Sequence, residues 1–189
     1  MTGYYDYAPT HVLDRPLVLA GYFADQTRYL GFRLAALTGL PVNNLDRLIE
    51  HRTGKSIWDL VWSEGEARYR ALETELLDRS LRERPCSIVT LGDGALIDEG
   101  NRRRVAEGAQ LVVFDVDLPN FYWRLKASEV ADNDFWHPLH AGPVQGFEQV
   151  RPFYQQRQPG FATADHHIEL AGRDDARLFD ALMELLAEP

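Results

Sequence analysis

Short, continuously apolar runs alternate along the chain with longer stretches in which apolar residues recur every three or four positions. The run at 111–114, Leu-Val-Val-Phe, is typical of a strand buried on both faces. Strands that alternate with helices predict an α/β domain of three layers, with a parallel sheet of about five strands at its centre. The predicted strands are at about 16–20, 41–45, 86–91, 111–114 and 167–170. The predicted helices are at about 27–37, 46–53, 64–81, 101–108, 118–126, 147–156 and 174–187, and a further helix is predicted to start at 56–59 with Ser56 as its cap.

No repeat and no linker divides this pattern, so residues 16–189 are predicted to form a single domain. Residues 1–15 precede it as a tyrosine-rich, aperiodic extension. Its tyrosines (Tyr4, Tyr5 and Tyr7) favour a contact with a partner protein or with a second copy in a homodimer. Residues 129–145 combine Pro, Gly, Asp, Asn and His without a period, which predicts a loop of functional length.

Composition and charge argue against several classes of function but add little about the fold. The formal net charge of −9 argues against a nucleic-acid partner and against binding to an anionic membrane. No apolar run approaches membrane-spanning length, and the N-terminus lacks the basic and apolar regions of a signal peptide. A single cysteine, Cys86, excludes an internal disulfide. A cytoplasmic location is the expectation that follows.

The first predicted strand ends at Gly21 and is followed by a helix, which is the outline of a phosphate-binding loop, G-x-x-x-x-G-K-[ST]. The residues do not match that motif. Gln26 stands at the second glycine, Thr27 at the lysine and Arg28 at the hydroxyl that would bind magnesium, while Asp25 adds a negative charge. A side chain at 26 is unfavourable where the backbone must approach a phosphate closely. The sequence therefore predicts a degenerate nucleotide loop.

The order of motifs along the chain nevertheless resembles the shikimate kinase family. Residues 65–73, Gly-Glu-Ala-Arg-Tyr-Arg-Ala-Leu-Glu, resemble its segment GExxFRxxE, which is long and specific. Six shorter segments occur in the family order. Residues 44–50 resemble DxDxxIE, residues 54–57 resemble GxSI, and residues 91–95 resemble the triple-glycine loop. Residues 124–125 resemble the RL before the lid, residues 137–140 resemble the RPLL of the lid, and residues 157–165 resemble RxPLYxxxAD. The resemblance implies a P-loop-kinase-like fold of the shikimate kinase type, with a lid at about 129–145.

The resemblance also implies a set of site residues. Arginines matching Arg70 and Arg157 would hold the substrate carboxylate, and an aspartate matching Asp46 would meet the ring hydroxyls together with the glycine loop, whose residues here are Gly92, Asp93 and Gly94. The nucleotide side departs from the family: besides positions 26–28, Asn44 replaces an aspartate that supports the metal, and His137 replaces the lid arginine. Arg124 is the remaining candidate there.

Each of these residues also has an ordinary structural explanation. The sole role of Arg70 could be an ion pair with Glu66 or Glu73 on its own helix. Asp46 could be a helix cap and nothing more, and Arg157 could be a solvated loop arginine. The histidines at 137, 140, 166 and 167 with Asp165 suggest a metal site, but their spacing is not fixed by a helix face. No metal and no cofactor are therefore expected.

The hypothesis that follows is a protein that binds a shikimate- or chorismate-like cyclic carboxylate without conventional ATP-dependent phosphoryl transfer. In its first form the protein is a lyase, dehydratase or isomerase with Asp46, Asp93 and His137 as acid and base groups. A second form is a non-catalytic sensor or regulator, that is, a pseudokinase. A third is an active small-molecule kinase with a non-standard nucleotide site.

Overall fold

The computed structural model describes residues 11–92, 94–131 and 146–187. Its centre is a sheet of five parallel strands in the order β2-β3-β1-β4-β5, which confirms the predicted fold class. The central strand β1 is buried along its whole length, because it lies between β3 and β4 and is covered on both faces. The strands are β1 (Leu17–Gly21), β2 (Val42–Asn44), β3 (Ile88–Thr90), β4 (Gln110–Asp115) and β5 (His166–Glu169).

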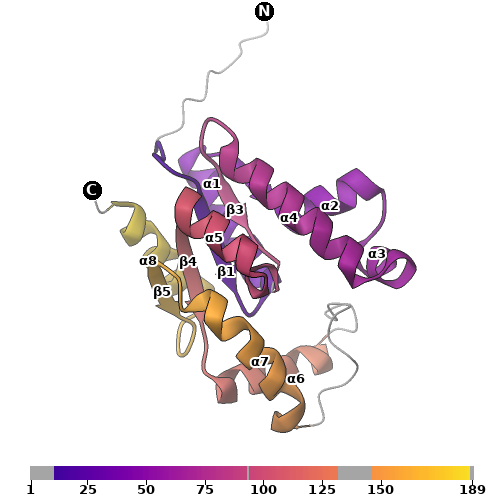
Figure 1. Ribbon diagram of the computed structural model, residues 1–189. Helices are drawn as coiled ribbons and strands as arrows, with labels where there is room; N and C mark the ends of the chain where they lie inside the picture. Colours follow the sequence, from indigo (N-terminus) through magenta and orange to yellow (C-terminus); the bar gives the residue numbers. More distant parts are fainter. Residues whose placement is uncertain (1–10, 93, 132–145, 188–189) are drawn as a thin grey trace, which may run out of the picture.

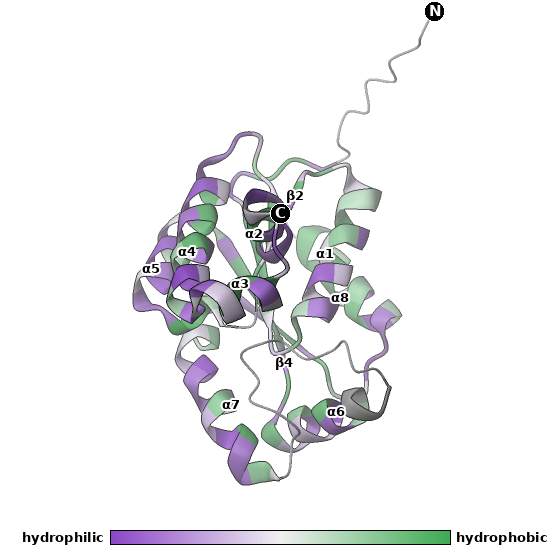
Figure 2. Ribbon diagram, turned by 90° about the vertical axis from the view of Figure 1, so that its right-hand side faces the viewer, coloured by the Kyte–Doolittle hydropathy of each residue, from purple (hydrophilic) through white to green (hydrophobic). Residues whose placement is uncertain are grey.

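Helices cover both faces of this sheet (Figure 1). In Figure 2, α1 and α8 lie on one side of the strands, and α4 and α5 lie on the other. The helices are α1 (Ala24–Thr38), α2 (Leu45–Thr53), α3 (Ile57–Glu64), α4 (Glu66–Arg82), α5 (Glu99–Gly108), α6 (Leu118–Ala131), α7 (Phe147–Phe161) and α8 (Asp175–Ala187), with one 3-10 turn, η1 (Ala95–Ile97). Within the described residues, no helix is both long and apolar enough to cross a membrane.

Two helices differ from their predictions. Helix α1 begins at Ala24, not near 27, so the predicted loop at 24–28 is part of the helix. Helix α7 continues through Pro152 and Pro159 to Phe161, although a proline in a helix interior removes a hydrogen bond. A tertiary contact supports its last turn, because Gly160 packs directly against the backbone of Leu96 in η1.

The predicted lid and the N-terminal extension lie mostly outside the described residues. The described part of the chain stops at Ala131 and resumes at Gly146, and it begins at His11. The predicted contact through Tyr4, Tyr5 and Tyr7 therefore stays a prediction. The described elements bring the carboxyl ends of β1, β2 and β3 to one edge of the sheet, which is where open α/β sheets bind ligands.

Helix α1 approaches β3 most closely at Gly31. A Cβ added there would lie 2.3 Å from Cγ2 of Thr90. Thr90 cannot turn away without loss, because its hydroxyl accepts a hydrogen bond from Asn44 Nδ2 at 2.8 Å. We expect Gly31→Ala to lower the free energy of unfolding by about 1–3 kcal/mol, even though alanine gains up to about 1 kcal/mol in helix propensity.

Urea unfolding measures this change, and Gly108→Ala is the matched control. The nearest atoms to a Cβ at Gly108 belong to Leu81 and lie 3.9 and 4.0 Å away. The control should be neutral or slightly stabilising. A Gly31→Ala protein as stable as the wild type would show that the approach of α1 to β3 is not tight.

Candidate functional site

Asp46 lies in the first turn of α2, directly after the carboxyl end of β2. The N-cap of this helix is Asn44, whose side-chain oxygen accepts a hydrogen bond from the backbone N–H of Arg47 at 2.9 Å. Asp46 is therefore not the cap. Its carboxylate oxygen Oδ1 instead accepts a hydrogen bond from the Tyr69 hydroxyl of α4 at 2.8 Å.

Helix α4 contributes three neighbouring polar side chains to this place. Glu73 is fully buried, and its carboxylate accepts a hydrogen bond from Arg70 Nη1 at 2.6 Å. Arg70 also donates from Nε to Glu66 at 3.2 Å, so the pairing expected from an ordinary helix surface is present. Its side chain is 24% exposed, which leaves it at the rim of the site. Burial, and next the charges of the nearby carboxylates, raise the pKa of Tyr69 well above its usual value.

The glycine loop after β3 passes close to these side chains. A Cβ added at Gly92 would lie 2.8 Å from the Tyr69 hydroxyl and 3.0 Å from the Glu73 carboxylate. At Gly94, an added Cβ would lie 2.3 Å from Arg70 Nη2. A side chain at either position would displace a polar group of α4: the Tyr69 hydroxyl at Gly92 and the flexible guanidinium of Arg70 at Gly94. The structure thus brings Gly92 and Gly94 together with Arg70 and Asp46.

Arg157 lies on α7 and is only 2% exposed, so it is not a solvated loop arginine. Its Nη1 donates a hydrogen bond to the backbone carbonyl oxygen of Phe153 at 2.7 Å. Its guanidinium stacks on the Phe153 ring, 3.6 Å from the ring centre. Gly160, one turn further along α7, packs on Leu96, and η1 directly follows Gly94. This contact fixes α7, and Arg157 with it, beside the glycine loop.

Two predicted acid–base groups cannot be placed. Asp93 and His137 lie outside the described residues, as does His140. Their assignment to the site stays a prediction.

The connection between β1 and α1 consists of only Tyr22 and Phe23, which follow Gly21. A phosphate-binding loop has four residues between its two glycines. Tyr22 is buried, and its hydroxyl accepts a hydrogen bond from Gln158 Nε2. Burial raises the pKa of Tyr22 above its usual value. Its ring is in contact with three other aromatic rings, those of Phe121, Tyr154 and Phe161.

Gln26, in the first turn of α1, connects two other helices. Its side-chain oxygen accepts a hydrogen bond from Arg124 Nη2 at 3.2 Å, and its Nε2 donates to Asp175 at 3.0 Å. Burial lowers the pKa of the Arg124 guanidinium, and the charge of Asp175 opposes that shift. The Thr27 hydroxyl donates to the carbonyl oxygen of Phe23 at 3.1 Å. The first turn of α1 is thus held by contacts within the protein.

The family resemblance implies that the residues at positions 28 and 44 support magnesium binding, but Arg28 and Asn44 have other contacts here. Arg28 has no lone pair for a metal and forms an ion pair with Asp25 at 2.5 Å. Asn44 is buried, and both ends of its amide are used, by the backbone N–H of Arg47 and by the hydroxyl of Thr90. These positions therefore do not fit a magnesium ion.

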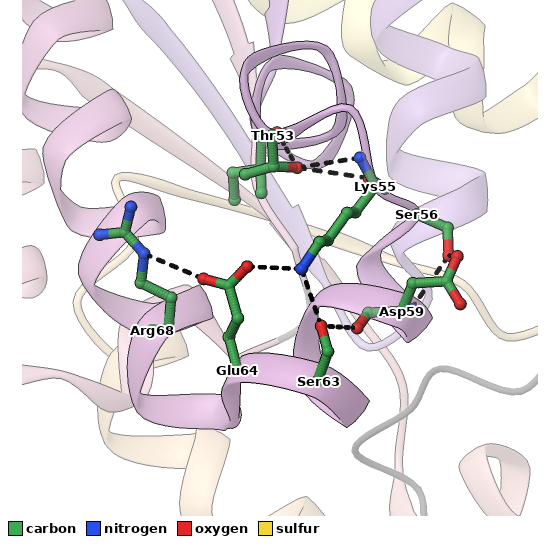
Figure 3. Close-up of polar contacts among 8 residues, drawn as sticks. Thr53, Lys55, Ser56, Asp59, Ser63, Glu64 and Arg68 are labelled. Atoms are coloured by element: carbon green, nitrogen blue, oxygen red, sulfur yellow. Dashed lines mark hydrogen bonds and ion pairs between the residues drawn. The ribbon is translucent and has the colours of Figure 1, made fainter.

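The chain has only two lysines, Lys55 and Lys126, and neither lies in the nucleotide loop. Figure 3 shows the polar contacts of Lys55. Its ammonium donates to Ser63 at 3.0 Å and to the Glu64 carboxylate at 2.7 Å, and Arg68 lies 3.6 Å from the same carboxylate. The hydrogen bond from Lys55 lowers the pKa of the exposed Glu64. Lys55 thus ties the loop before α3 to the end of that helix.

His166 and His167 form pairs with polar neighbours in the sheet. His167 Nδ1 contacts the Asp115 carboxylate across β4 and β5, and His166 Nε2 lies 2.9 Å from Gln110 Nε2. Within residues 11–92, 94–131 and 146–187, no three His, Cys, Asp or Glu side chains gather as a metal site would require.

Sequence reasoning missed two members of this site, Tyr69 and Glu73. From the sequence alone, the helical spacing of Tyr69 with Leu72, Leu76 and Leu77 indicates an apolar helix face, and Glu73 looks like an ion-pair partner of Arg70. A signal for both existed, because they occupy two fixed positions of GExxFRxxE, the motif that also contains Arg70.

Comparison with known proteins gives a consistent result. A shikimate kinase of Deinococcus radiodurans is 26% identical over 181 residues, which cover 94% of this chain and 88% of that protein. One of Xanthomonas campestris pv. campestris is 35% identical over 156 residues, covering 79% and 83%. The solved structure of shikimate kinase from Acinetobacter baumannii in complex with shikimate superposes with a TM-score of 0.75 at 22% identity, covering 92% and 93% of the two chains.

These similarities contradict the hypothesis of a lyase, dehydratase or isomerase, and with it the expectation that conventional kinase activity is absent. Relatives between 26% and 35% identical over most of the chain are named shikimate kinases, which supports a kinase. The pseudokinase alternative is not supported either. The hypothesis was wrong because it gave the residues at 26–28 more weight than the similarity of the other segments to the shikimate kinase motifs.

The match is not limited to single motifs. The family model for shikimate kinase matches residues 28–187, from the first helix of the domain to its last. The chain therefore belongs to the shikimate kinase family.

Proposed function

We propose that this protein is a small-molecule kinase that transfers a phosphoryl group from ATP to a hydroxyl group of shikimate. The observation that carries the proposal is the cluster at the carboxyl edge of the sheet. There Asp46 and Arg70 meet the glycine loop at Gly92 and Gly94 in a chain of this family. The cluster combines a carboxylate for a hydroxyl with an arginine for a carboxylate, which are the two functional groups of a hydroxylated acid.

Within this proposal, Asp46 accepts the proton of the hydroxyl that attacks the phosphorus. Its place in the first turn of α2 suits this role, because the helix N-terminus stabilises an ionised carboxylate. Arg70 and Arg157 bind the carboxylate of the acid. A planar guanidinium can offer two parallel hydrogen bonds to a carboxylate, and this fixes the orientation of the ring relative to Asp46.

The phosphates need positive charge, because phosphoryl transfer depends mainly on positioning and on electrostatic stabilisation of the transferred group. With no lysine in the loop, we assign this role to Arg28 and Arg124. Arg28 extends from the second turn of α1, and Arg124 from α6 reaches Gln26 in the first turn of the same helix. Both lie at the end of β1, where the family fold places its nucleotide loop.

The first prediction concerns the general base. Incubation with ATP, magnesium chloride and shikimate should give phosphorylated shikimate, detected by mass spectrometry. Asp46→Asn keeps the shape of the side chain and removes its basicity, so we expect kcat to fall by about 10²- to 10⁴-fold, with a smaller change in KM.

Asp180→Asn is the matched control, since Asp180 is exposed on α8. It should keep full activity. No phosphorylated shikimate from the wild-type protein would refute the proposed function, and an Asp46→Asn protein of undiminished kcat would refute the role of Asp46.

The second prediction concerns the carboxylate. Arg70→Ala and Arg157→Lys should each raise KM for shikimate by about tenfold to a few hundredfold, because hydrogen bonds to charged groups are worth about 1.5–3 kcal/mol each. KM for ATP should change little. Lysine at 157 keeps a positive charge in this buried place, so the variant tests the planar fork and not the charge alone.

Arg151→Lys provides the comparison on the same helix, because Arg151 is 44% exposed and pairs with Glu148. It should leave both KM values unchanged. If both site variants bind shikimate as the wild type does while remaining folded by circular dichroism, the acid binds elsewhere.

The third prediction concerns the nucleotide. Arg124→Ala removes one of the two assigned cations, and we expect KM for ATP to rise by about tenfold or more while KM for shikimate stays within about twofold. Steady-state kinetics with each substrate varied in turn separates the two effects. An unchanged KM for ATP in both Arg124→Ala and Arg28→Ala would place the phosphates away from these arginines.

A further inference from the structure

The Tyr69 side chain contacts the carboxylates of both Asp46 and Glu73. It is fully buried, and a buried phenol needs a hydrogen-bond partner. Two acceptors are within reach: Asp46 Oδ1 lies 2.8 Å from its hydroxyl, and Glu73 Oε1 lies 3.3 Å away. The hydroxyl has one proton to donate, so only one of the two can receive it.

The distances decide which carboxylate receives the proton. A length of 2.8 Å is ordinary for an O–H···O hydrogen bond, whereas 3.3 Å is beyond the usual range. Glu73 has a closer donor of its own, because Arg70 Nη1 lies 2.6 Å from its other oxygen. The Tyr69 proton therefore points to Asp46, while the charge of Glu73 is met by Arg70.

The phenol is well suited to remain a donor. Its burial and the two carboxylates beside it keep the hydroxyl protonated. Gly92 leaves room for this arrangement, since a Cβ at that position would lie 2.8 Å from the hydroxyl and 3.2 Å from Asp46 Oδ1. The Arg70 guanidinium covers the ring at 4.9 Å from its centre. Tyr69 is thus fixed between the proposed base and the proposed carboxylate clamp.

We propose that the Tyr69 hydroxyl is a positioning group for the charge of Asp46: by donating a hydrogen bond to the carboxylate, it favours the ionised form. The proposal rests on the proposed kinase function for its catalytic consequence, but the hydrogen bond itself is independent of that function. The family motif GExxFRxxE has phenylalanine at this position, so the hydroxyl is a feature of this chain and not of the motif.

Several groups of the described residues lie close to Asp46. From α4 they are Tyr69 and Glu73, with Arg70 paired to the latter, and from the loop after β3 it is the backbone of Gly92. The N-terminus of α2 also favours the ionised carboxylate. Removing the hydroxyl leaves every other charge in place, so the resulting change can be attributed to this one hydrogen bond.

Tyr69→Phe is the test, because it deletes the hydroxyl and keeps the buried ring. Carbon-13 NMR follows the Asp46 carboxyl as a function of pH, with the signal assigned by its absence in Asp46→Asn. Loss of a donor disfavours the charged carboxylate, so Asp46 should titrate at a higher pH in Tyr69→Phe than in the wild type. Tyr29→Phe is the matched control: Tyr29 is 49% exposed on α1, and its variant should leave the titration unchanged.

Kinetics provide a second readout that a merely structural role would not give. The ratio of wild-type to Tyr69→Phe kcat should be about tenfold at the acid end of the active range and should approach one at alkaline pH, where Asp46 is ionised in both proteins. KM for ATP should not change. A rate loss of equal size at every pH would indicate packing damage and would overturn the positioning role.

The two readouts separate this proposal from the proposed function. An unchanged Asp46 titration in Tyr69→Phe would overturn the hydrogen-bond assignment, whether or not the protein phosphorylates shikimate. A shifted titration in a protein that forms no phosphorylated shikimate would establish the interaction and refute only the kinase reaction.

Discussion

The close approach of the glycine loop to α4 is the constraint on which the acceptor site depends. Gly92 lies so near to Tyr69 and Glu73, and Gly94 so near to Arg70, that a side chain at either loop position would displace these polar groups. This contact removes the Glu73 carboxylate from water entirely. A buried carboxylate is costly unless it is paired and hydrogen-bonded, and Arg70 meets that need at 2.6 Å. Ion pairs with Glu66 and Glu73 hold Arg70 on α4, and Gly94 of the loop lies close to its guanidinium.

The same loop leads directly into η1, and η1 is the surface against which α7 packs at Gly160. In this way one continuous segment aligns three elements that are far apart in sequence: α2 with Asp46, α4 with Arg70, and α7 with Arg157. Asp46, Tyr69, Glu73 and Arg70 are joined by hydrogen bonds and an ion pair, whereas the printed contacts of Arg157 are with Phe153 of its own helix. In the proposed function, the fixed positions of these groups orient the acid toward Asp46.

The nucleotide side is built differently. Tyr22 and Phe23 form a short connection, and the rings packed around Tyr22 occupy the end of β1 with apolar surface. Gln26 joins α1 to Arg124 and Asp175 by hydrogen bonds. Arg28 in α1 and Arg124, which donates to Gln26, lie at this end of the sheet, and the proposed function assigns the positive charge for the phosphates to them. A guanidinium differs from an ammonium in offering a planar set of donors to phosphate oxygens.

The sequence by itself determined the sheet, the order of its elements and the family, because apolar periodicity and local motifs are written in consecutive residues. Leu-Val-Val-Phe at 111–114 and the motif at 65–73 needed no tertiary information. It did not determine where α1 begins or that α7 continues past Pro159, because tertiary contacts of Tyr22 and Gly160 override local preference there. Only the tertiary structure showed that Tyr69 lies between Asp46 and Glu73. A tyrosine on an apolar helix face looks like core in the sequence, and its role is decided by a carboxylate 23 residues away that the fold brings within 2.8 Å.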